Sequence, residues 1–160
     1  MGETTAQIAQ ANPQTDYIAI EVHGPGVGSL LMKIDALELK NLRVIRHDAV
    51  EVLVNMIPDG LLAGIHLFFP DPWPKKRHHK RRLIQAPFAA LAARKLERGG
   101  YIHAATDWPE YAEQMDVVLA QEPMLQKADQ SKARPITKFE RRGIGLGHPV
   151  RDLLFLRRQE

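Results

Sequence analysis

Residues 64–82 read GIHLFFPDPWPKKRHHKRR and carry three signals in succession. The first six residues, 64–69, are an apolar run with the length and composition of a buried strand. Pro70, Pro72 and Pro74 follow at alternate positions, and because proline continues neither a central strand nor a helix, the chain must leave the sheet here as a stiff loop. In open α/β sheets, ligands bind at the carboxyl ends of the strands. This loop is therefore the first candidate for a functional site.

The segments on either side of this stretch alternate between strand-like and helix-like patterns. Strands are predicted at residues 17–22, 42–47, 64–69 and 100–105. Helices are predicted at residues 4–11, 28–40, 49–56 and 80–98. Asp48 and Asp107 directly follow strands, at positions where helix N-caps are expected. The alternation predicts an α/β protein with a mostly parallel sheet and helices on both of its faces.

The front of the chain departs from this alternation. Met1, Gly2 and Glu3 lead straight into a helical pattern, whereas an open α/β sheet normally starts with a central strand and a glycine-rich turn. We therefore expect the first strand to be missing, with Gly2 as the last glycine of its turn. Residues 1–160 are expected to form one domain that is truncated at its N-terminus.

The net charge of +3 is concentrated in one place. Six cations fall within residues 75–82, which leaves 16 basic and 19 acidic side chains in the rest of the chain and a net charge there of −3. A local basic block on a nearly neutral domain indicates an anionic partner that is met at one surface, such as a nucleic acid.

The composition excludes several other classes of protein. Hydrophobic residues make up 44% of the chain, enough for a packed core, and there is no cysteine, which rules out disulfides, thiolate zinc sites and a cysteine nucleophile. The apolar run at residues 61–69 is interrupted by His66 and is too short to cross a bilayer. Because no basic-then-apolar leader opens the chain, we expect neither membrane insertion nor secretion.

Asp71 is the most distinctive single residue of the loop. It lies between Pro70 and Pro72, with Trp73 two positions later and the basic block directly behind. A carboxylate fixed beside an aromatic ring can accept hydrogen bonds from a flat heterocycle, while the cations that follow hold a phosphate backbone. The alternative is a plain surface loop that leads into a solvated basic helix.

Two other patterns favour ordinary structural explanations. His78 and His79 are adjacent and lack the i, i+4 spacing with which two imidazoles on one helix face share a metal, so no metal is expected. Residues 24–29, GPGVGS, superficially match a dinucleotide fingerprint, but the third glycine would fall on Ser29. A simple helix entry is favoured there.

Four carboxylates are expected along one edge of the predicted sheet, namely those of Glu21, Asp48, Asp71 and Asp107. Helix capping explains Asp48 and Asp107 but not Glu21, whose position near the end of a strand suits the hydroxyls of a ribose. Further along, residues 137–140 read TKFE, which by itself is also compatible with a capping box.

The chain resembles one known family along almost its whole length. The segment FFPDPWPKKRHHKRRL at residues 68–83 is similar to the bacterial tRNA (guanine-N7)-methyltransferase family, TrmB. Four more segments resemble the family in the same order, and they read IEVHGPGVGSLL, NLRVIRHDAVEVL, GGYIHAATDWPEYAEQM and RPITKFERRGIGLGH. The resemblance implies a Rossmann-like class I methyltransferase that moves a methyl group from S-adenosylmethionine to N7 of a guanosine in the tRNA variable loop.

The resemblance also implies roles for individual residues. Cofactor contacts match Gly2, Glu21 for the ribose, Asp48 for the adenine side, and Asp71 at the methyl-transfer site. Contacts with tRNA and guanine match a larger set, consisting of Lys75, Arg77, His78, His79, Lys80, Arg81, Arg82, Asp107, Thr137, Lys138, Phe139 and Glu140. The implied protein is cytoplasmic, a monomer or homodimer, binds tRNA but no membrane and no metal, and releases S-adenosylhomocysteine.

The front of the chain is the departure from the family. The family's first strand carries E-I-G-F-G-M-G. Only the last two residues of that run are present here, as Met1 and Gly2. We therefore expect weak or absent binding of S-adenosylmethionine by residues 1–160. A competing interpretation is a noncatalytic RNA-binding domain of the same fold, and binding of S-adenosylmethionine would separate the two.

Overall fold

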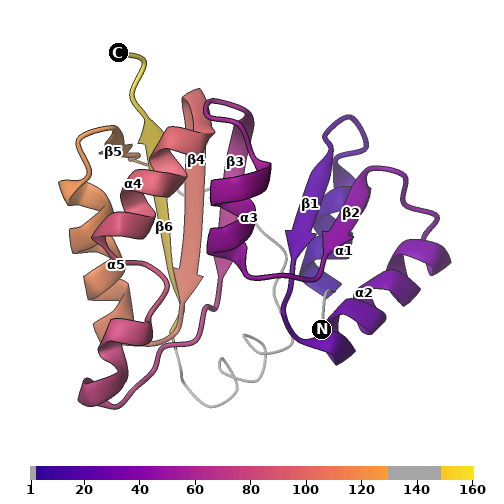
Figure 1. Ribbon diagram of the computed structural model, residues 1–160, viewed down its shortest axis with the longest axis horizontal. Coiled ribbons are helices and arrows are strands. Elements are labelled where there is room, and N and C mark those ends of the chain that lie inside the picture. Colours follow the sequence, from indigo (N-terminus) through magenta and orange to yellow (C-terminus); the bar gives the residue numbers. More distant parts are fainter. Residues whose placement is uncertain (1–2, 130–148) are drawn as a thin grey trace. The chain divides into compact units, whose positions relative to one another are not determined.

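The computed structural model describes residues 3–129 and 149–160, which divide into two compact units. The first unit contains residues 3–55 and the second contains residues 56–129 together with 149–160. The sheets follow the same division. Strands β1 (Tyr17–Ile20) and β2 (Leu42–Ile45) pair with each other, and a four-stranded sheet has the order β3-β4-β6-β5 (Figure 1).

The first unit combines the β1–β2 pair with helices α1 (Glu3–Ala11) and α2 (Gly24–Ala36), and it includes α3 (Ala49–Met56) up to residue 55. The two strands are parallel, with Tyr17 opposite Leu42 and Ile20 opposite Ile45. A small apolar core joins the helices to the strands, and its buried members are Ala6, Ala9, Leu30 and Leu42. The unit is therefore held together by side chains from α1, α2 and β2, against which the partly buried Tyr17 and Ala19 of β1 pack.

Asn41 ties the end of α1 to the start of the strand pair. Its side-chain nitrogen Nδ2 lies 2.9 Å from the carbonyl oxygen of Ala9, 3.0 Å from that of Asn12 and 2.8 Å from that of Thr15. Its own carbonyl accepts the Tyr17 N–H at 2.7 Å. These bonds connect the last turn of α1 and the loop that follows it to the residue directly before β2.

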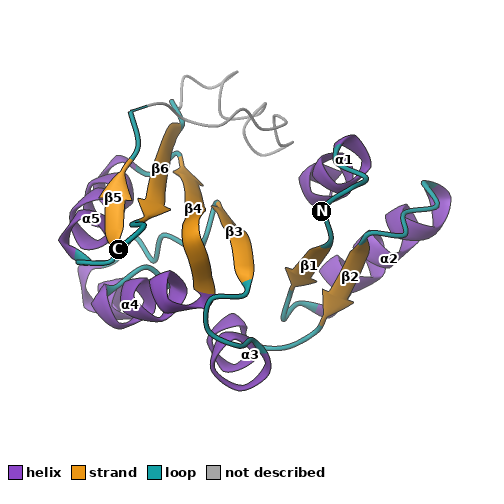
Figure 2. Cartoon of the chain, turned by 90° about the horizontal axis from the view of Figure 1, so that it is seen from above, coloured by secondary structure: helices purple, strands orange, loops and turns teal. Residues whose placement is uncertain are grey.

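The second unit is built on β3 (Leu62–Phe68), β4 (Leu96–Thr106), β5 (Leu125–Lys127) and β6 (Arg151–Arg157). The pairing of β3 with β4 is parallel, whereas β6 runs antiparallel to both β4 and β5. Helices α4 (Ala86–Lys95) and α5 (Pro109–Gln121) lie along one face of this sheet (Figure 2). The core contains Ile102, Tyr111, Met115 and Phe155, each with none of its surface exposed.

Two polar contacts fix side chains inside the four-stranded sheet. His103 on β4 is 1% exposed, and its Nε2 lies 2.8 Å from a carboxylate oxygen of Asp152 on β6. On the neighbouring strand, His66 Nε2 lies 2.8 Å from the Tyr101 hydroxyl. A Cβ at Gly64 would come within 2.3 Å of the Tyr101 ring, so a residue without a side chain is needed where this ring crosses β3.

The α/β fold class predicted from the sequence is confirmed, with corrections to several elements. The sheet is mixed and not mostly parallel, because β6 runs antiparallel to β4 and to β5, and neither β5 nor β6 was predicted. Helix α5 was also not predicted, and its N-cap is Trp108 and not Asp107. Asp48, in contrast, is confirmed as a cap, since its carboxylate accepts the Glu51 N–H at 3.2 Å where α3 begins.

The prediction of one helix over residues 80–98 is wrong. A short 3₁₀ helix, η1 (Lys76–Arg81), ends before α4 begins at Ala86, and residues 96–98 already belong to β4. The Gln85 side chain separates the two helices by donating to the carbonyls of Lys80 at 2.6 Å and Arg82 at 2.8 Å. Pro87, in the first turn of α4, favours a helix start at this position.

The predicted helix entry at residues 24–29 is confirmed, since α2 begins at Gly24 with Pro25 in its first turn. This start lies four residues before the predicted one, because proline has the backbone angle that a first helical turn requires. Among the described residues, no helix is long and apolar enough to span a membrane.

Candidate nucleic-acid and nucleotide site

The loop after β3 holds Asp71 at the carboxyl end of the strand, as the proline spacing predicted. The Phe69 N–H continues the pairing with β4 by donating to the Ala105 carbonyl at 2.8 Å, after which the chain leaves the sheet. Asp71 is exposed, and its Oδ1 accepts the Trp73 backbone N–H at 2.9 Å. This bond closes a small turn around Pro72 and gives the carboxylate a defined direction.

The same loop contains two aromatic residues in an unusual backbone conformation. Phe69 has a φ of 54° and Trp73 a φ of 41°, and bulky side chains rarely occupy this left-handed region. The two residues bracket Asp71, one on each side. Backbone strain of this kind persists only where surrounding contacts impose it, and it gathers at functional sites.

The basic segment at residues 75–82 contains η1, whose three-residue period places its side chains on different sides. In a 3₁₀ helix, side chains three positions apart lie above one another. His78 and Arg81 therefore share one side, where the His78 ring lies 5.8 Å from the Trp73 ring and the Arg81 guanidinium lies 5.1 Å from it. His79 and Arg82 share another side, and both reach Glu110 on α5.

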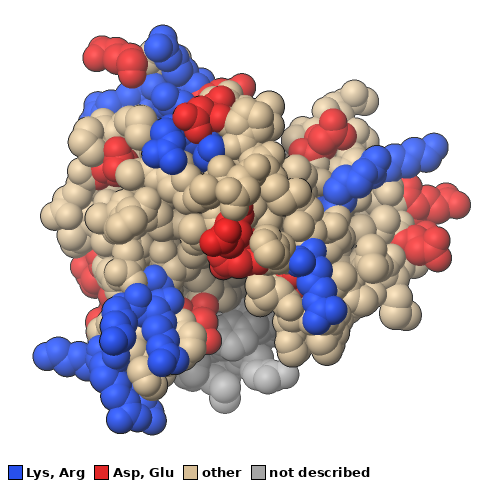
Figure 3. Space-filling view, viewed as in Figure 1, with Lys and Arg blue, Asp and Glu red and all other residues tan. Residues whose placement is uncertain are grey.

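Five cations of this segment are exposed, namely Lys75, Lys76, Arg77, Lys80 and Arg81. Figure 3 shows these Lys and Arg side chains gathered in blue at the lower left. We call this group the exposed basic surface. Its charge and its position next to the Asp71 loop suit a phosphate backbone that passes beside the carboxylate.

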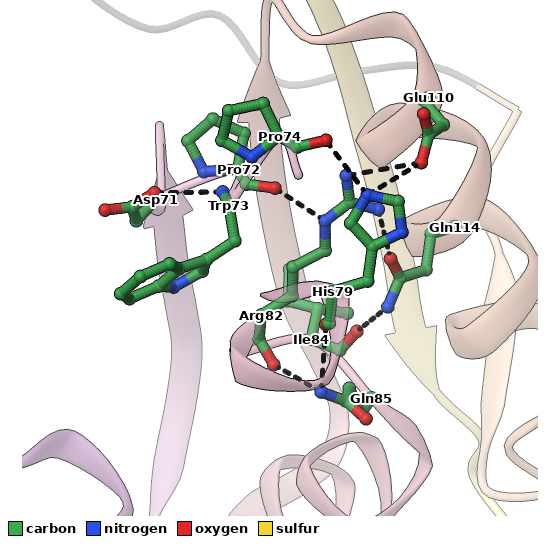
Figure 4. A network of polar contacts seen from close by, with 10 residues as sticks. All are labelled: Asp71, Pro72, Trp73, Pro74, His79, Arg82, Ile84, Gln85, Glu110 and Gln114. Atoms are coloured by element: carbon green, nitrogen blue, oxygen red, sulfur yellow. Dashed lines mark hydrogen bonds and ion pairs between the residues drawn. The ribbon is translucent and has the colours of Figure 1, made fainter. Parts of the chain in front are cut away.

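Arg82 does not belong to the exposed basic surface. The residue is 3% exposed, and its guanidinium is surrounded by protein groups (Figure 4). His79 is partly buried, with its Nε2 3.3 Å from the Pro74 carbonyl oxygen and 3.3 Å from a carboxylate oxygen of Glu110. The local sequence does not distinguish these two residues from their exposed neighbours, because their burial depends on contacts with α5.

The four carboxylates expected along one edge fall into two pairs. Glu21 directly follows β1 and Asp48 follows β2, so both lie at the carboxyl end of the parallel strand pair in the first unit. The Glu21 side chain accepts the His23 N–H at 3.0 Å. In the second unit, Asp71 and Asp107 follow β3 and β4, which are also parallel neighbours.

Asp107 lies in the short link between β4 and α5 and is partly exposed. Beside it, the Thr106 hydroxyl accepts the Trp108 N–H at 3.2 Å, which turns the chain into the helix. Asp71 and Asp107 therefore both lie where the four-stranded sheet presents the ends of its parallel strands. Gly2, Thr137, Lys138, Phe139 and Glu140 lie outside the described residues. Among the described residues, no cluster of three metal-ligating side chains occurs.

Three side chains of α5 belong to the site but were missed by the sequence analysis. Glu110 and Gln114 are spaced i, i+4 and contact the basic segment. The ring of Tyr111 packs against the Arg82 guanidinium. Burial raises the pKa of the Tyr111 phenol above its ordinary value, and its oxygen accepts the Ile84 N–H at 3.1 Å. The i, i+4 spacing of Glu110 and Gln114 is the signal that could have indicated a contact face, had the helix been predicted.

Comparison with known proteins gives consistent matches. The family described as "Putative methyltransferase" matches residues 1–153. The tRNA (guanine-N(7)-)-methyltransferase of Methylobacillus flagellatus is 59% identical over 99% of this chain and 68% of its own length. The protein of the same name from Neisseria meningitidis serogroup B is 61% identical, over 98% of this chain and 68% of its own length.

The fold is also similar to those of solved structures, among them the following two. NSun6 from Pyrococcus horikoshii with SFG has a TM-score of 0.67 at 21% identity, covering 99% of this chain and 46% of that chain. NodS from Bradyrhizobium japonicum, an N-methyltransferase in complex with S-adenosyl-L-homocysteine, has a TM-score of 0.63 at 11% identity, with coverage of 98% and 72%. At these identities the similarity establishes the fold, which is that of the class I methyltransferases.

Proposed function

Because this chain belongs to the tRNA (guanine-N7)-methyltransferase family, we propose that it methylates N7 of a guanosine in the variable loop of tRNA, with S-adenosylmethionine as methyl donor. One observation carries the proposal furthest. The Asp71 carboxylate is exposed at the carboxyl end of β3, held in a turn, and followed within the same unit by the exposed basic surface. A fixed acceptor beside a row of cations suits a nucleobase whose backbone is held nearby.

The chemistry of guanine defines the task of Asp71. N7 has a lone pair and carries no proton at neutral pH, so its methylation requires no general base. Asp71 instead orients the base by accepting hydrogen bonds from the N1–H and the N2 amino group. Its negative charge also offsets the positive charge that develops on the ring, and a preorganised charge of this kind contributes more than a flexible one.

The first unit supplies groups that fit the donor. Glu21 and Asp48 are acceptors at the carboxyl end of β1 and β2, and a nucleoside presents ribose hydroxyls and an amino group as donors. We assign Glu21 to the ribose and Asp48 to the adenine side. S-adenosylmethionine, when bound, supplies an electrophilic methyl group on a sulfonium. The chain's own part is then to bind and align, and alignment can lower the barrier by about 7 to 11 kcal/mol.

Other parts of the proposal rest on the family resemblance. Lys75, Asp107 and residues 137–140 are proposed to contact the tRNA and its guanine, and Gly2 to contact the cofactor. S-adenosylhomocysteine is the proposed product, and no metal takes part. We further propose a cytoplasmic protein that acts as a monomer or a homodimer.

The direct test is the formation of 7-methylguanosine. The protein is incubated with S-adenosylmethionine and a tRNA transcript, and the digested nucleosides are analysed by mass spectrometry. We expect 7-methylguanosine to form, and to be lost when the variable-loop guanosine is replaced by adenosine. Tight tRNA binding without any methylation would instead favour the noncatalytic RNA-binding domain.

Substitutions of Asp71 test its assigned role. Asp71→Asn keeps an oxygen that can accept the Trp73 N–H but removes the charge, and we expect kcat to fall by about 100-fold or more. Asp71→Ala also removes the acceptor and should abolish measurable transfer. In both variants tRNA affinity should stay close to wild type, because many cations hold the backbone. Turnover near the wild-type rate in Asp71→Asn would show that its charge is not needed for the reaction.

A further inference from the structure

Arg82 is the one arginine of the basic segment, residues 75–82, that is buried. Its Nε donates to the Pro72 carbonyl at 2.6 Å, and one terminal nitrogen donates to the Gln114 side-chain oxygen at 2.6 Å. The other terminal nitrogen lies 3.4 Å from Glu110, and the guanidinium carbon lies 4.9 Å from the centre of the Tyr111 ring. Figure 4 shows the guanidinium between the Pro72 carbonyl and the side chains of α5.

The bond to Pro72 acts on the turn that holds Asp71. The Pro72 carbonyl belongs to the same peptide group as the Trp73 N–H, and that N–H donates to Asp71 Oδ1. Arg82 therefore donates to the carbonyl of the peptide group between Pro72 and Trp73, and the N–H of the same peptide group donates to the Asp71 carboxylate. The φ of 41° at Trp73 is a conformation that needs such an external hold.

We propose that Arg82 is a positioning residue for Asp71. It anchors the turn of residues 71–73 to α5 and makes no contact with tRNA, which corrects its assignment to the RNA-binding residues. The catalytic meaning of this role rests on the function proposed for Asp71, whereas the anchoring of the turn does not.

The shape of the arginine side chain is essential to this role. Its planar guanidinium reaches Pro72, Gln114 and Glu110 in three directions at once, while a lysine ammonium is a point charge on a flexible four-carbon stem. Arg82→Lys therefore keeps the charge and loses the geometry. Arg98 is exposed near the start of β4, at the end of that strand opposite to Asp107, and Arg98→Lys is the matched control for the same chemical change.

The first measurement follows the turn itself. The chain has two tryptophans, so a Trp108→Phe background leaves Trp73 as the only tryptophan reporter. We expect Arg82→Lys to increase quenching of Trp73 fluorescence by acrylamide while the far-ultraviolet circular dichroism is unchanged. Arg98→Lys should leave the quenching as it is. Unchanged quenching in Arg82→Lys would overturn the proposal.

The second measurement separates positioning from RNA binding. In Arg82→Lys, kcat for tRNA methylation should fall by about 10- to 100-fold with little change in KM for tRNA, since small misplacements of a reacting group cost this much. Arg82→Met removes the charge, and we expect the salt dependence of tRNA binding to stay at the wild-type slope. A slope lower by about one unit would show a phosphate contact and contradict the proposal.

A third variant keeps the proposal testable if Arg82 substitutions do not fold. Gln114→Ala leaves Arg82 in place but removes one of its acceptors, and should raise Trp73 quenching and lower kcat in the same direction. If neither quantity changes, the proposed anchoring is wrong. Absence of methylation by the wild-type protein would count against the proposed function alone, because the fluorescence comparison does not depend on catalysis.

Discussion

The buried phenol of Tyr111 joins three parts of the second unit. It accepts the Ile84 N–H, lies beneath the Arg82 guanidinium, and is itself on α5. Burial disfavours the negatively charged phenolate, which raises the pKa of Tyr111 above its ordinary value near 10. The proton is thus held more tightly in the folded protein than in the unfolded chain.

This shift predicts how stability changes in alkaline solution. The contribution of the Tyr111 phenol to the free energy of unfolding is fully present below pH 10. It is lost as the pH rises through the raised pKa of the folded state. Tyr111→Phe removes the titrating group, so its free energy of unfolding should decline less steeply above pH 10 than that of the wild type. At pH 7 the variant should be less stable by about 1 to 3 kcal/mol, because the Ile84 N–H loses its acceptor. Urea denaturation at pH 7, 9 and 10.5 measures both effects, and parallel pH curves would contradict the prediction.

The left-handed conformations of Phe69 and Trp73 are a second feature at the level of single residues. Each costs on the order of 1 to 3 kcal/mol unless other contacts compensate. The identified compensation at Trp73 comes from Asp71, which accepts its N–H, and from Arg82, which holds the preceding carbonyl. The strained residues therefore flank Asp71, the residue proposed to act in the reaction, and Asp71 itself accepts one of the compensating hydrogen bonds.

The helix η1 divides one charged segment into an exposed side and a side that contacts α5. With three residues per turn, positions 79 and 82 face α5, while positions 77 and 80 face solvent. An α-helix, with 3.6 residues per turn, would not bring two side chains three positions apart to the same line. The same run of cations therefore has an exposed side, which is proposed to bind tRNA, and another side that contacts α5.

This division predicts the salt dependence of tRNA binding. The double variant Lys80→Gln with Arg81→Gln removes two members of the exposed basic surface and should lower the slope of affinity against salt by about two units. A matched double variant, Arg94→Gln with Arg98→Gln, removes the same charge from exposed positions outside η1. Filter-binding titrations at several salt concentrations compare the two. An equal fall in both variants would mean that only net charge matters, and not the position of η1.

At the level of the whole chain, the two units differ in how their strands are supported. Strand β4 is paired on both sides and contributes Ile102 and Ala104 to the core with none of their surface exposed. Within residues 3–129 and 149–160, the sheet that contains β1 and β2 has two strands, and Ile18 on β1 is 47% exposed. Isolated two-stranded pairs are only marginally stable, whereas three or more strands with a buried face stabilise one another.

Native-state hydrogen exchange should reveal this difference. We expect the amides of residues 101–106 to exchange more slowly than those of residues 17–20 and 42–45, by roughly tenfold or more, because opening free energies follow local packing. Mass spectrometry of peptides from the two units, collected over a time course at fixed pH, gives the comparison. Equal protection in both units would show that they open together as one cooperative body.

Local sequence determined much of this protein. The prolines around Asp71 stop β3 and form the loop, Asp48 caps α3, Pro25 begins α2, and the run at residues 75–82 concentrates the positive charge. Each of these outcomes depends on residues within a few positions of one another, where backbone geometry and hydrogen bonding act directly. The family resemblance was equally readable, because the motifs that carry it are continuous segments.

The tertiary structure alone decided which members of the basic segment are free to bind. Arg82 and Arg81 are neighbours of the same residue type, yet one is 3% exposed and the other is exposed. The difference comes from Glu110 and Gln114, which are about 30 positions away and approach only when α5 packs beside η1. In the same way, His103 obtains its partner Asp152 from a strand 49 residues further along. Long-range contacts of this kind leave no local pattern, because the burial that selects them arises only when the elements have packed together.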